Sequence, residues 1–146
     1  MCTYLLALFV TCRSEVPPQI SEENLQLIFG ALKEAEKFKV DGEIALLNLQ
    51  YGFAEGKFTK SLNLLVREKR KCYTPAIKVI IADLYSSRAV CRVETGYQES
   101  ALSDAEESLR FFDENRQASL LKGNILKALG RNQEGKTELE KGFPNE

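Results

Sequence analysis

Apolar residues recur at helical spacing along most of the chain. After the helix-breaking pair Pro17–Pro18, an apolar stripe follows at steps of three and four residues. The stripe consists of Leu25, Ile28, Phe29 and Leu32. Ser21 can cap this helix, and the two glutamates that follow it favour the first turn. We expect the helix to end near Lys39, with Asp41–Gly42 as the turn into the next element.

The stretch richest in β-branched residues is also predicted to be helical. It covers residues 78–82, Lys-Val-Ile-Ile-Ala, and follows Pro75, a residue type that often begins helices. Its apolar pattern continues to Leu84 and Ala89 at helical spacing. The pattern therefore predicts an all-α fold.

An internal repeat with a period of 34 residues runs through the second half of the chain. The matched residues are Ala89 and Gly123, Gly96 and Gly130, Ala101 and Gly135, and Leu109 and Phe143. Such a period is typical of two antiparallel helices stacked on their own copy. Small residues are needed where helices approach most closely, so the matched alanines and glycines predict the helix crossings.

These segments resemble tetratricopeptide repeats (TPRs), in particular those of the co-chaperone type. The resemblance rests on YSSRAVCRVETGYQESALSDAEESLR at residues 85–110 and on SLLKGNILKALGRNQEGKTELEKGF at residues 119–143. A weaker unit precedes them, with AEGKF at residues 54–58 as the inter-helix turn. In that unit Ser61 is aligned with Ala101, 40 residues further on, so about six extra residues are expected around 69–75.

The resemblance implies a right-handed α-solenoid of helix-turn-helix units, about three of them plus an amino-terminal helix. The units are expected at about 42–71, 75–113 and 114–143, in a helical repeat domain over residues 21–146. Residues 1–20 form a separate apolar amino-terminal segment. The inner seam between units is expected to hold Leu49, Tyr85, Ala89, Ala101, Leu102, Ala105, Leu109, Ile125 and Leu139.

The charge pattern argues against a nucleic-acid partner. The formal net charge is −1, whereas proteins that neutralise phosphates usually carry a clustered positive excess. One basic cluster, residues 67–71, is interpreted as a helix end with a solvated loop, not as a phosphate or membrane contact. The acidic residues are interpreted as a solvated outer helix face; they are Glu99, Asp104, Glu106, Glu107, Asp113 and Glu114.

The cysteine and histidine content limits the chemistry that the chain can perform. The four cysteines are Cys2, Cys12, Cys72 and Cys91, with no close pair, and the sequence contains no histidine. Zinc sites that use histidine and histidine-dependent nucleophilic catalysis are therefore excluded. We expect free thiols, a cytoplasmic location, no metal, no cofactor and no enzymatic activity.

The apolar run Leu-Leu-Ala-Leu-Phe-Val at residues 5–10 has two interpretations. It is too short to span a bilayer, which takes about 20 residues. It can pack as a helix on the first unit or on another chain, or it can serve as a targeting signal. No basic residue precedes it and no small-x-small cleavage site follows, which favours packing.

Function in this family implies a concave groove that receives a peptide or a helix of a partner. The co-chaperone branch holds the terminal carboxylate of a chaperone tail with lysine, asparagine and arginine side chains. The matching positions here hold Ser87, Gln117 and Leu121, and in the first unit they fall near Leu46 and Gln50. None of these positions keeps its donor type, so recognition of such a tail is not the favoured hypothesis.

The expected groove is largely apolar, with amide and hydroxyl groups between the apolar residues. Its lining consists of Leu46, Gln50, Phe53, Ser86, Val90, Val93, Leu120, Leu121, Asn124 and Lys127. Such a surface suits an uncharged or amphipathic segment, so we expect a non-catalytic scaffold or adaptor with a protein or peptide partner. Two alternatives stay open: a co-chaperone adaptor that recognises an acidic carboxy-terminal tail, and a fragment of a larger TPR-containing enzyme.

The end of the repeat array suggests a further contact. Repeat arrays usually close with an extra helix whose outer face is polar. Here residues 143–146 follow the third unit directly. We therefore expect Leu139 and Phe143 to be partly exposed, or to be covered by the amino-terminal segment or by a second chain that contacts this uncapped repeat.

Overall fold

The structure is a computed structural model that describes residues 22–66 and 75–142. The helices in these ranges are α2 (Glu22–Leu47), α3 (Tyr51–Val66), α4 (Pro75–Glu94), α5 (Gln98–Phe111), α6 (Arg116–Ala128) and α7 (Asn132–Gly142). No strand occurs within the same ranges, so the predicted all-α fold is confirmed. The predictions for the apolar run at 5–10, the basic cluster at 67–71 and Phe143 lie outside the described residues.

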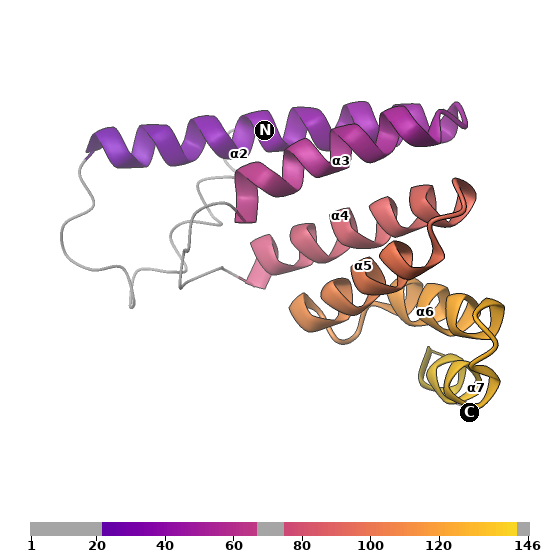
Figure 1. Cartoon of the computed structure of the whole chain (residues 1–146). Coiled ribbons are helices and arrows are strands. Elements are labelled where there is room, and N and C mark those ends of the chain that lie inside the picture. The colour runs from indigo at the N-terminus through magenta and orange to yellow at the C-terminus, as the bar shows by residue number, and fades with distance from the viewer. Residues whose placement is uncertain (1–21, 67–74, 143–146) are drawn as a thin grey trace.

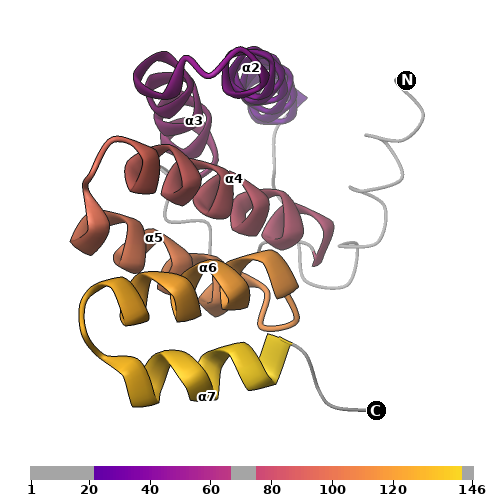
Figure 2. The same ribbon diagram turned by 90° about the vertical axis from the view of Figure 1, so that its right-hand side faces the viewer.

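The helices form three antiparallel pairs, α2 with α3, α4 with α5 and α6 with α7 (Figure 1). Figure 2 shows the pairs stacked in chain order, from α2 and α3 at the top to α6 and α7 at the bottom. Helix α4 contacts both helices of the first pair, and α6 contacts both helices of the second. This arrangement is the predicted solenoid of helix-turn-helix units. The expected ranges 75–113 and 114–143 each contain one of the pairs.

The first helix of every pair ends in the same backbone motif. The residue that follows the helix has a positive φ angle, and its amide donates to a carbonyl of the last helical turn. Gly96 (φ 86°) and Gly130 (φ 81°) occupy this position in the second and third pairs, and Leu49 (φ 58°) occupies it in the first. The Leu49 amide donates to the Leu46 carbonyl at 3.0 Å. Leu49 is 69% exposed, so its predicted place in the inner seam is wrong.

Helix α2 continues through Asp41–Gly42, so the predicted turn at these residues is also wrong. Gly42 is buried and lies against the aromatic ring of Phe58 on α3. A Cβ atom at Gly42 would lie only 2.7 Å from Phe58 Cε1. The glycine therefore allows a close approach of two helices and does not mark a turn. As a consequence, the predicted amino-terminal helix and the first helix of the first unit are one continuous helix.

The first pair is in register with the second at a spacing of 47 residues, whereas the second and third pairs are 34 residues apart. The equivalent residues are Gly42 and Ala89, Leu49 and Gly96, Ala54 and Ala101, and Ser61 and Ser108. The predicted alignment of Ser61 with Ala101 is thus wrong by seven residues. Two features of the sequence caused the error: the longer spacing between the pairs, and a leucine where the other turns have glycine.

Two buried serines confirm this register. Ser61 Oγ donates to the Ala35 carbonyl at 2.7 Å, and Ser108 Oγ donates to the Ala82 carbonyl at 2.7 Å. Each bond joins the second helix of a pair to its first helix. Because both the donors and the acceptors are 47 residues apart, Ser61 corresponds to Ser108.

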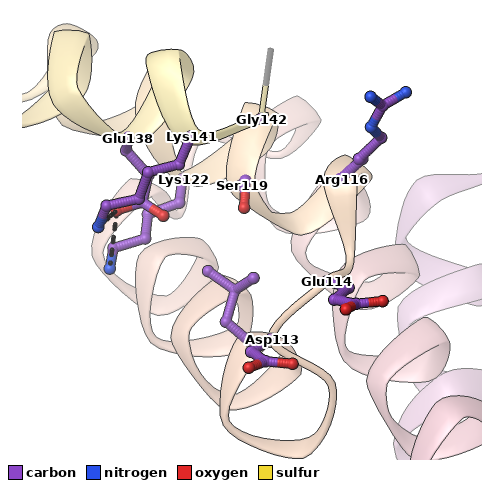
Figure 3. A pocket seen from close by; sticks show the side chains of 9 residues that line it. Asp113, Glu114, Arg116, Ser119, Lys122, Glu138, Lys141 and Gly142 are labelled. Atoms are coloured by element: carbon purple, nitrogen blue, oxygen red, sulfur yellow. Dashed lines mark hydrogen bonds and ion pairs between the residues drawn. The ribbon is translucent and has the colours of Figure 1, made fainter. Parts of the chain in front are cut away.

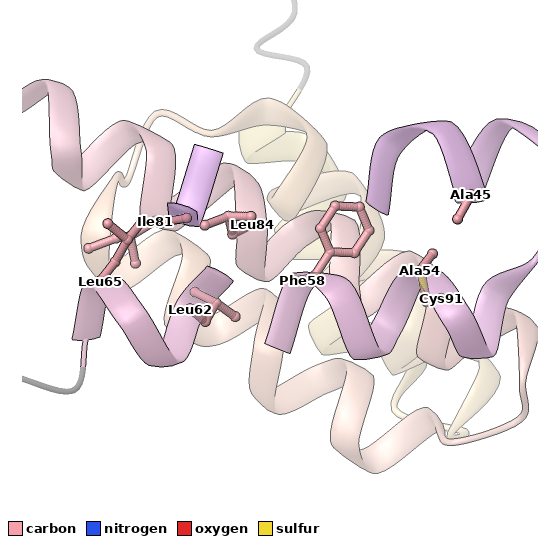
Figure 4. Packing of buried hydrophobic residues seen from close by; sticks show 9 residues of the cluster. Ala45, Ala54, Phe58, Leu62, Leu65, Ile81, Leu84 and Cys91 are labelled. Atoms are coloured by element: carbon pink, nitrogen blue, oxygen red, sulfur yellow. The ribbon is translucent and has the colours of Figure 1, made fainter. Parts of the chain in front are cut away.

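The core consists of two clusters of apolar side chains. The larger cluster lies between α2, α3 and α4, where Leu62, Ile81 and Leu84 lie near one another (Figure 4). The smaller one joins the second and third pairs and consists of Ala89, Ala101, Leu102, Ile125 and Leu126. Their burial confirms that these predicted seam residues lie inside. Each large aliphatic side chain contributes about 1.5–3 kcal/mol before the loss of chain entropy is counted.

The predicted crossing of α6 and α7 is confirmed at Gly123 and Gly135. A Cβ atom on Gly135 would lie 2.7 Å from the Gly123 carbonyl oxygen, and one on Gly123 would lie 2.6 Å from Leu139 Cγ. Only glycine at both positions lets the two backbones approach this closely. Leu139 is half-buried against this crossing.

An ion pair at an equivalent position links the two helices of every pair. The residue immediately before the crossing glycine or alanine bonds to a residue of the second helix. The three pairs are Asp41–Lys57 at 2.8 Å, Arg88–Asp104 at 2.7 Å and Lys122–Glu138 at 3.6 Å. Asp104 is 3% exposed and also pairs with Arg92 at 2.9 Å, so its predicted place on a solvated outer face is wrong. Two arginines of α4 reach α5 and draw this carboxylate inward.

Candidate partner-binding surface

Each first helix carries a strip of side chains that its neighbours leave partly uncovered. On α4, Ile81 and Leu84 belong to the larger core cluster and Ala89 to the smaller one. A strip at steps of four, three and four residues separates these two sides. Its members are exposed or half-buried, and they are Asp83, Ser87, Val90 and Glu94.

The structural register gives the corresponding strips on the other two first helices. They are Glu36, Val40, Glu43 and Leu47 on α2, and Gln117, Leu121, Asn124 and Ala128 on α6. All of these side chains are exposed or half-buried. Because α4 contacts both α2 and α6, the three strips lie on neighbouring helices. We call the surface formed by the three strips the first-helix face.

Three of the predicted groove residues lie on the first-helix face: Val90, Leu121 and Asn124. Two others, Val93 and Leu120, are half-buried beside it, and Val93 and Leu121 also pack on the smaller core cluster. Lys127 is exposed but belongs to the contact between α6 and α7. A Cβ atom on Gly135 would lie 2.8 Å from Lys127 Cγ.

Ser86 is not available to a partner, so its predicted place in the groove is wrong. It is 1% exposed, and its hydroxyl group donates to the Ala82 carbonyl at 2.9 Å. The side-chain amide of Asn115 donates to the same hydroxyl at 3.3 Å and to Ser108 Oγ at 3.0 Å. Ser86 is therefore part of a buried hydrogen-bond network that links α4, α5 and the start of α6.

The predicted groove residues of the first unit are displaced by the error in register. Gln50 lies in the turn after α2, and Phe53 lies on α3, where Lys57 Nζ is 5.1 Å from the centre of its ring. Leu46 alone lies on a first helix, half-buried beside the larger core cluster. Moving seven residues back along the chain replaces the three by Lys39, Glu43 and Leu46.

The electrostatics of the face are dominated by carboxylates where α2 meets α4. Lys39 Nζ lies 2.6 Å from Glu43 Oε1, so this lysine is already paired. Asp83 is exposed, and no other described residue forms an ion pair with its carboxylate. Burial raises the pKa of the Asp83 carboxyl above its ordinary value; the Lys39 charge lowers it and the Glu43 charge raises it further, with a net rise.

Sequence reasoning missed the exposed apolar residues of α2. Val40, Ile44 and Leu47 are 45%, 54% and 84% exposed and follow one another at steps of four and three residues. A spacing of 47 residues between the first two units would have placed Val40 and Leu47 on the face. That spacing is hidden in the sequence because Leu49 stands where glycine marks the other turns.

A hollow of about 350 Å³ between α5, α6 and α7 does not coincide with the first-helix face. Its lining contains none of the predicted groove residues. Figure 3 shows Lys122, Glu138 and Lys141 together at one wall. Both lysines pair with Glu138, at 3.6 and 3.3 Å. Since these charges neutralise one another, the hollow presents little unpaired chemistry to a ligand.

Other kinds of site find no support among the described residues. Within residues 22–66 and 75–142, no group of histidine, cysteine and acidic side chains could hold a metal ion. In the same part of the chain no helix is long and apolar enough to cross a membrane. Cys91 is a free, buried thiol, and burial raises its pKa to about 11, which keeps it protonated and unreactive near neutral pH.

Three solved structures resemble this arrangement of helix pairs. The TPR domain of Arabidopsis OM64 has a TM-score of 0.66 and 19% sequence identity, covering 77% of this chain and 83% of its own. The first TPR domain of Spaghetti (RPAP3), bound to the HSP90 peptide SRMEEVD, has a TM-score of 0.62 and 18% identity over 79% and 85% of the two chains. MamA has a TM-score of 0.61 and 14% identity, over 76% of this chain and 57% of its own.

No protein-family model and no curated protein sequence matches the chain. The structural similarity, together with the three stacked pairs, shows that the chain has the tetratricopeptide-repeat fold.

Proposed function

We propose that this protein is a non-catalytic interaction module that binds a segment of another polypeptide on the first-helix face. The observation that carries the proposal is the threefold recurrence of one uncovered strip, on α2, α4 and α6. Each strip combines apolar side chains with polar ones, as in Val90 beside Ser87 or Leu121 beside Asn124. Apolar anchors supply affinity, and neighbouring polar groups fix the orientation of a bound segment.

The known structures support this proposal through the fold alone. The Spaghetti (RPAP3) domain was solved with a peptide bound, which makes a polypeptide partner the natural class of ligand for a chain with the same fold. The free buried thiol of Cys91 is compatible with a cytoplasmic location, which we include in the proposal.

The co-chaperone alternative is less well supported. With the corrected register, the lysine expected in the first unit falls on Lys39, but Glu43 already pairs with this side chain. Ser87, Gln117 and Leu121 still occupy the other matching positions. A terminal carboxylate that leaves water needs fixed, charge-assisted donors, and these residues do not supply them.

Selection from a random peptide library displayed on phage tests the proposal. The full chain is immobilised, and enriched peptides are then measured by fluorescence anisotropy against two variants. Asn124→Trp places a large ring on the first-helix face at an exposed position, and Lys136→Trp makes the same change at an exposed position of α7. We expect a shared motif among the enriched peptides, with affinity reduced about tenfold or more by Asn124→Trp only.

Two results would contradict the proposal. One is the absence of any enrichment above that of an unrelated immobilised protein. The other is a set of enriched peptides that bind the parent and the Asn124→Trp variant equally well. Thermal melts of both variants establish that a loss of binding does not come from unfolding.

A further inference from the structure

The first-helix face carries negative charge and no basic residue of its own. Its ionisable members are Glu36, Glu43, Asp83 and Glu94, at equivalent or neighbouring positions of α2 and α4. The strip on α6 is uncharged. Lys39 lies beside the strip of α2, but its ammonium group is held by Glu43 at 2.6 Å. The face therefore has a net negative potential where the first and second pairs meet.

Asp83 has the least compensated charge in this group. No ion pair joins its carboxylate to any other residue in the described part of the chain, and Glu43 is near enough to repel it. The raised pKa of the Asp83 carboxyl has the same origin, since burial and a like charge both disfavour its ionised form. A cation brought to this place by a partner would relieve the repulsion between the two carboxylates.

Apolar side chains flank the carboxylates on the same face. Val40 and Leu47 are exposed next to Glu43 on α2, and Val90 is half-buried next to Asp83 on α4. Leu121 continues the apolar part onto α6. A partner that covers these side chains without leaving the carboxylates unpaired must carry both apolar and positively charged residues.

We propose that the first-helix face recognises a basic amphipathic segment, with lysine or arginine against Asp83 and Glu43 and with apolar residues against Val90 and Leu121. This proposal rests on the function proposed above and specifies the chemistry of the partner. It is opposite in charge to the acidic peptide SRMEEVD in the Spaghetti (RPAP3) structure. An acidic segment would bring further carboxylates against Asp83 and Glu43.

Two synthetic peptides test the proposed charge preference. One consists of repeated Leu-Lys-Ser units with blocked ends, and the other has glutamate in place of every lysine. Fluorescence anisotropy with the full chain at low salt should show at least about tenfold tighter binding of the lysine peptide, because paired charges attract and like charges repel. Added salt should reduce this difference, since it screens charges at the surface.

Variants of the protein assign the preference to Asp83. Asp83→Asn should weaken binding of the lysine peptide about threefold and Asp83→Lys about tenfold, with little effect on the glutamate peptide in the first case and tighter binding in the second. Glu99→Lys makes the same change in net charge at an exposed position of α5, away from the face, and should leave both affinities unchanged. Thermal melts confirm that each variant is folded.

The possible failures are distinguishable from one another. Equal binding of the two peptides, a preference for glutamate, no binding of the lysine peptide, or an equal effect of Glu99→Lys and Asp83→Lys would overturn the charge assignment. If the library selection still returns a motif that depends on Asn124, the interaction function stands and only the chemistry of the partner is wrong. If the selection returns no motif, the interaction function itself fails.

Discussion

The first and third helix pairs have the same architecture but use different residues to achieve it. In the third pair, two glycines face each other across the crossing of α6 and α7. In the first pair, Gly42 faces the ring of Phe58, so that one small and one large residue fill the same place. A repeat of this kind is therefore defined by the space available at equivalent positions, not by the identity of the residues that fill it.

The two pairs also differ in the surface that they expose. The first pair has exposed apolar side chains at Val40, Ile44, Leu47, Leu49 and Phe53. Helix α7 has no exposed large apolar residue within 132–142, and its exposed residues are mostly polar or charged. The described part of the third pair thus offers no apolar face to a second chain. The apolar surface lies at the opposite end of the stack.

The largest expected effect separates the ion pair of the central pair from that of the first. Asp104→Ala leaves Arg88 and Arg92 buried without their partner, so unfolding free energy should fall by about 3–5 kcal/mol. Asp41→Ala removes an exposed pair with Lys57 and should change stability little. Urea denaturation measures both. Equal losses would show that the two ion pairs are energetically alike; if the alanine variant does not fold, Asp104→Asn provides the same comparison.

A smaller effect is expected from added methyl groups at the helix crossings. Gly135→Ala places its Cβ against the backbone oxygen of Gly123 and should cost about 3 kcal/mol. Gly42→Ala meets a side-chain ring that can shift, so about 1–2 kcal/mol is expected. Gly30→Ala, on the same helix as Gly42, has no atom within 4 Å of the new Cβ. It should stabilise the protein by up to about 1 kcal/mol through helix propensity.

Thermal melts of these three variants test whether the crossings or the helix propensities dominate. Stabilisation by Gly42→Ala equal to that by Gly30→Ala would mean that Gly42 is not a crossing residue. The register of the first pair would then lose one of its supports.

The smallest effect concerns the residue that follows each first helix. Leu49 has a positive φ angle that glycine adopts without strain, and its side chain is mostly exposed. Leu49→Gly should therefore stabilise the protein by about 1 kcal/mol, and Gly96→Ala at the equivalent position should destabilise it by a similar amount. A shift of the melting temperature in the same direction for both variants would contradict the equivalence of the two turns.

Much of the fold was predictable because helix formation and close approach are recorded locally in the sequence. The period of 34 residues, Gly96 and Gly130 at the turns, and Gly123 and Gly135 at a crossing all follow from spacing and side-chain size. The same local signals misplaced the first unit. Gly42 resembles a turn residue in the sequence, and Leu49 does not, although the structure gives them the reverse roles.

The candidate site was only partly predictable, because exposure depends on which helix covers which face. Val90, Leu121 and Asn124 were placed correctly on first helices, whereas Ser86 proved to be buried. One position along the helix changes the direction of a side chain by about 100°, so a buried hydroxyl and an exposed one are neighbours in the sequence.

The sequence by itself determined that the chain forms paired helices, where most of them turn, and where two of the pairs cross, since these depend on short-range periodicity and residue size. Only the tertiary structure decided the register of the first pair, the inward position of Asp104 and the gathering of carboxylates around Asp83. These features arise between helices that are distant along the chain, and the residue types involved are equally compatible with solvent or with a neighbouring helix until the packing is known.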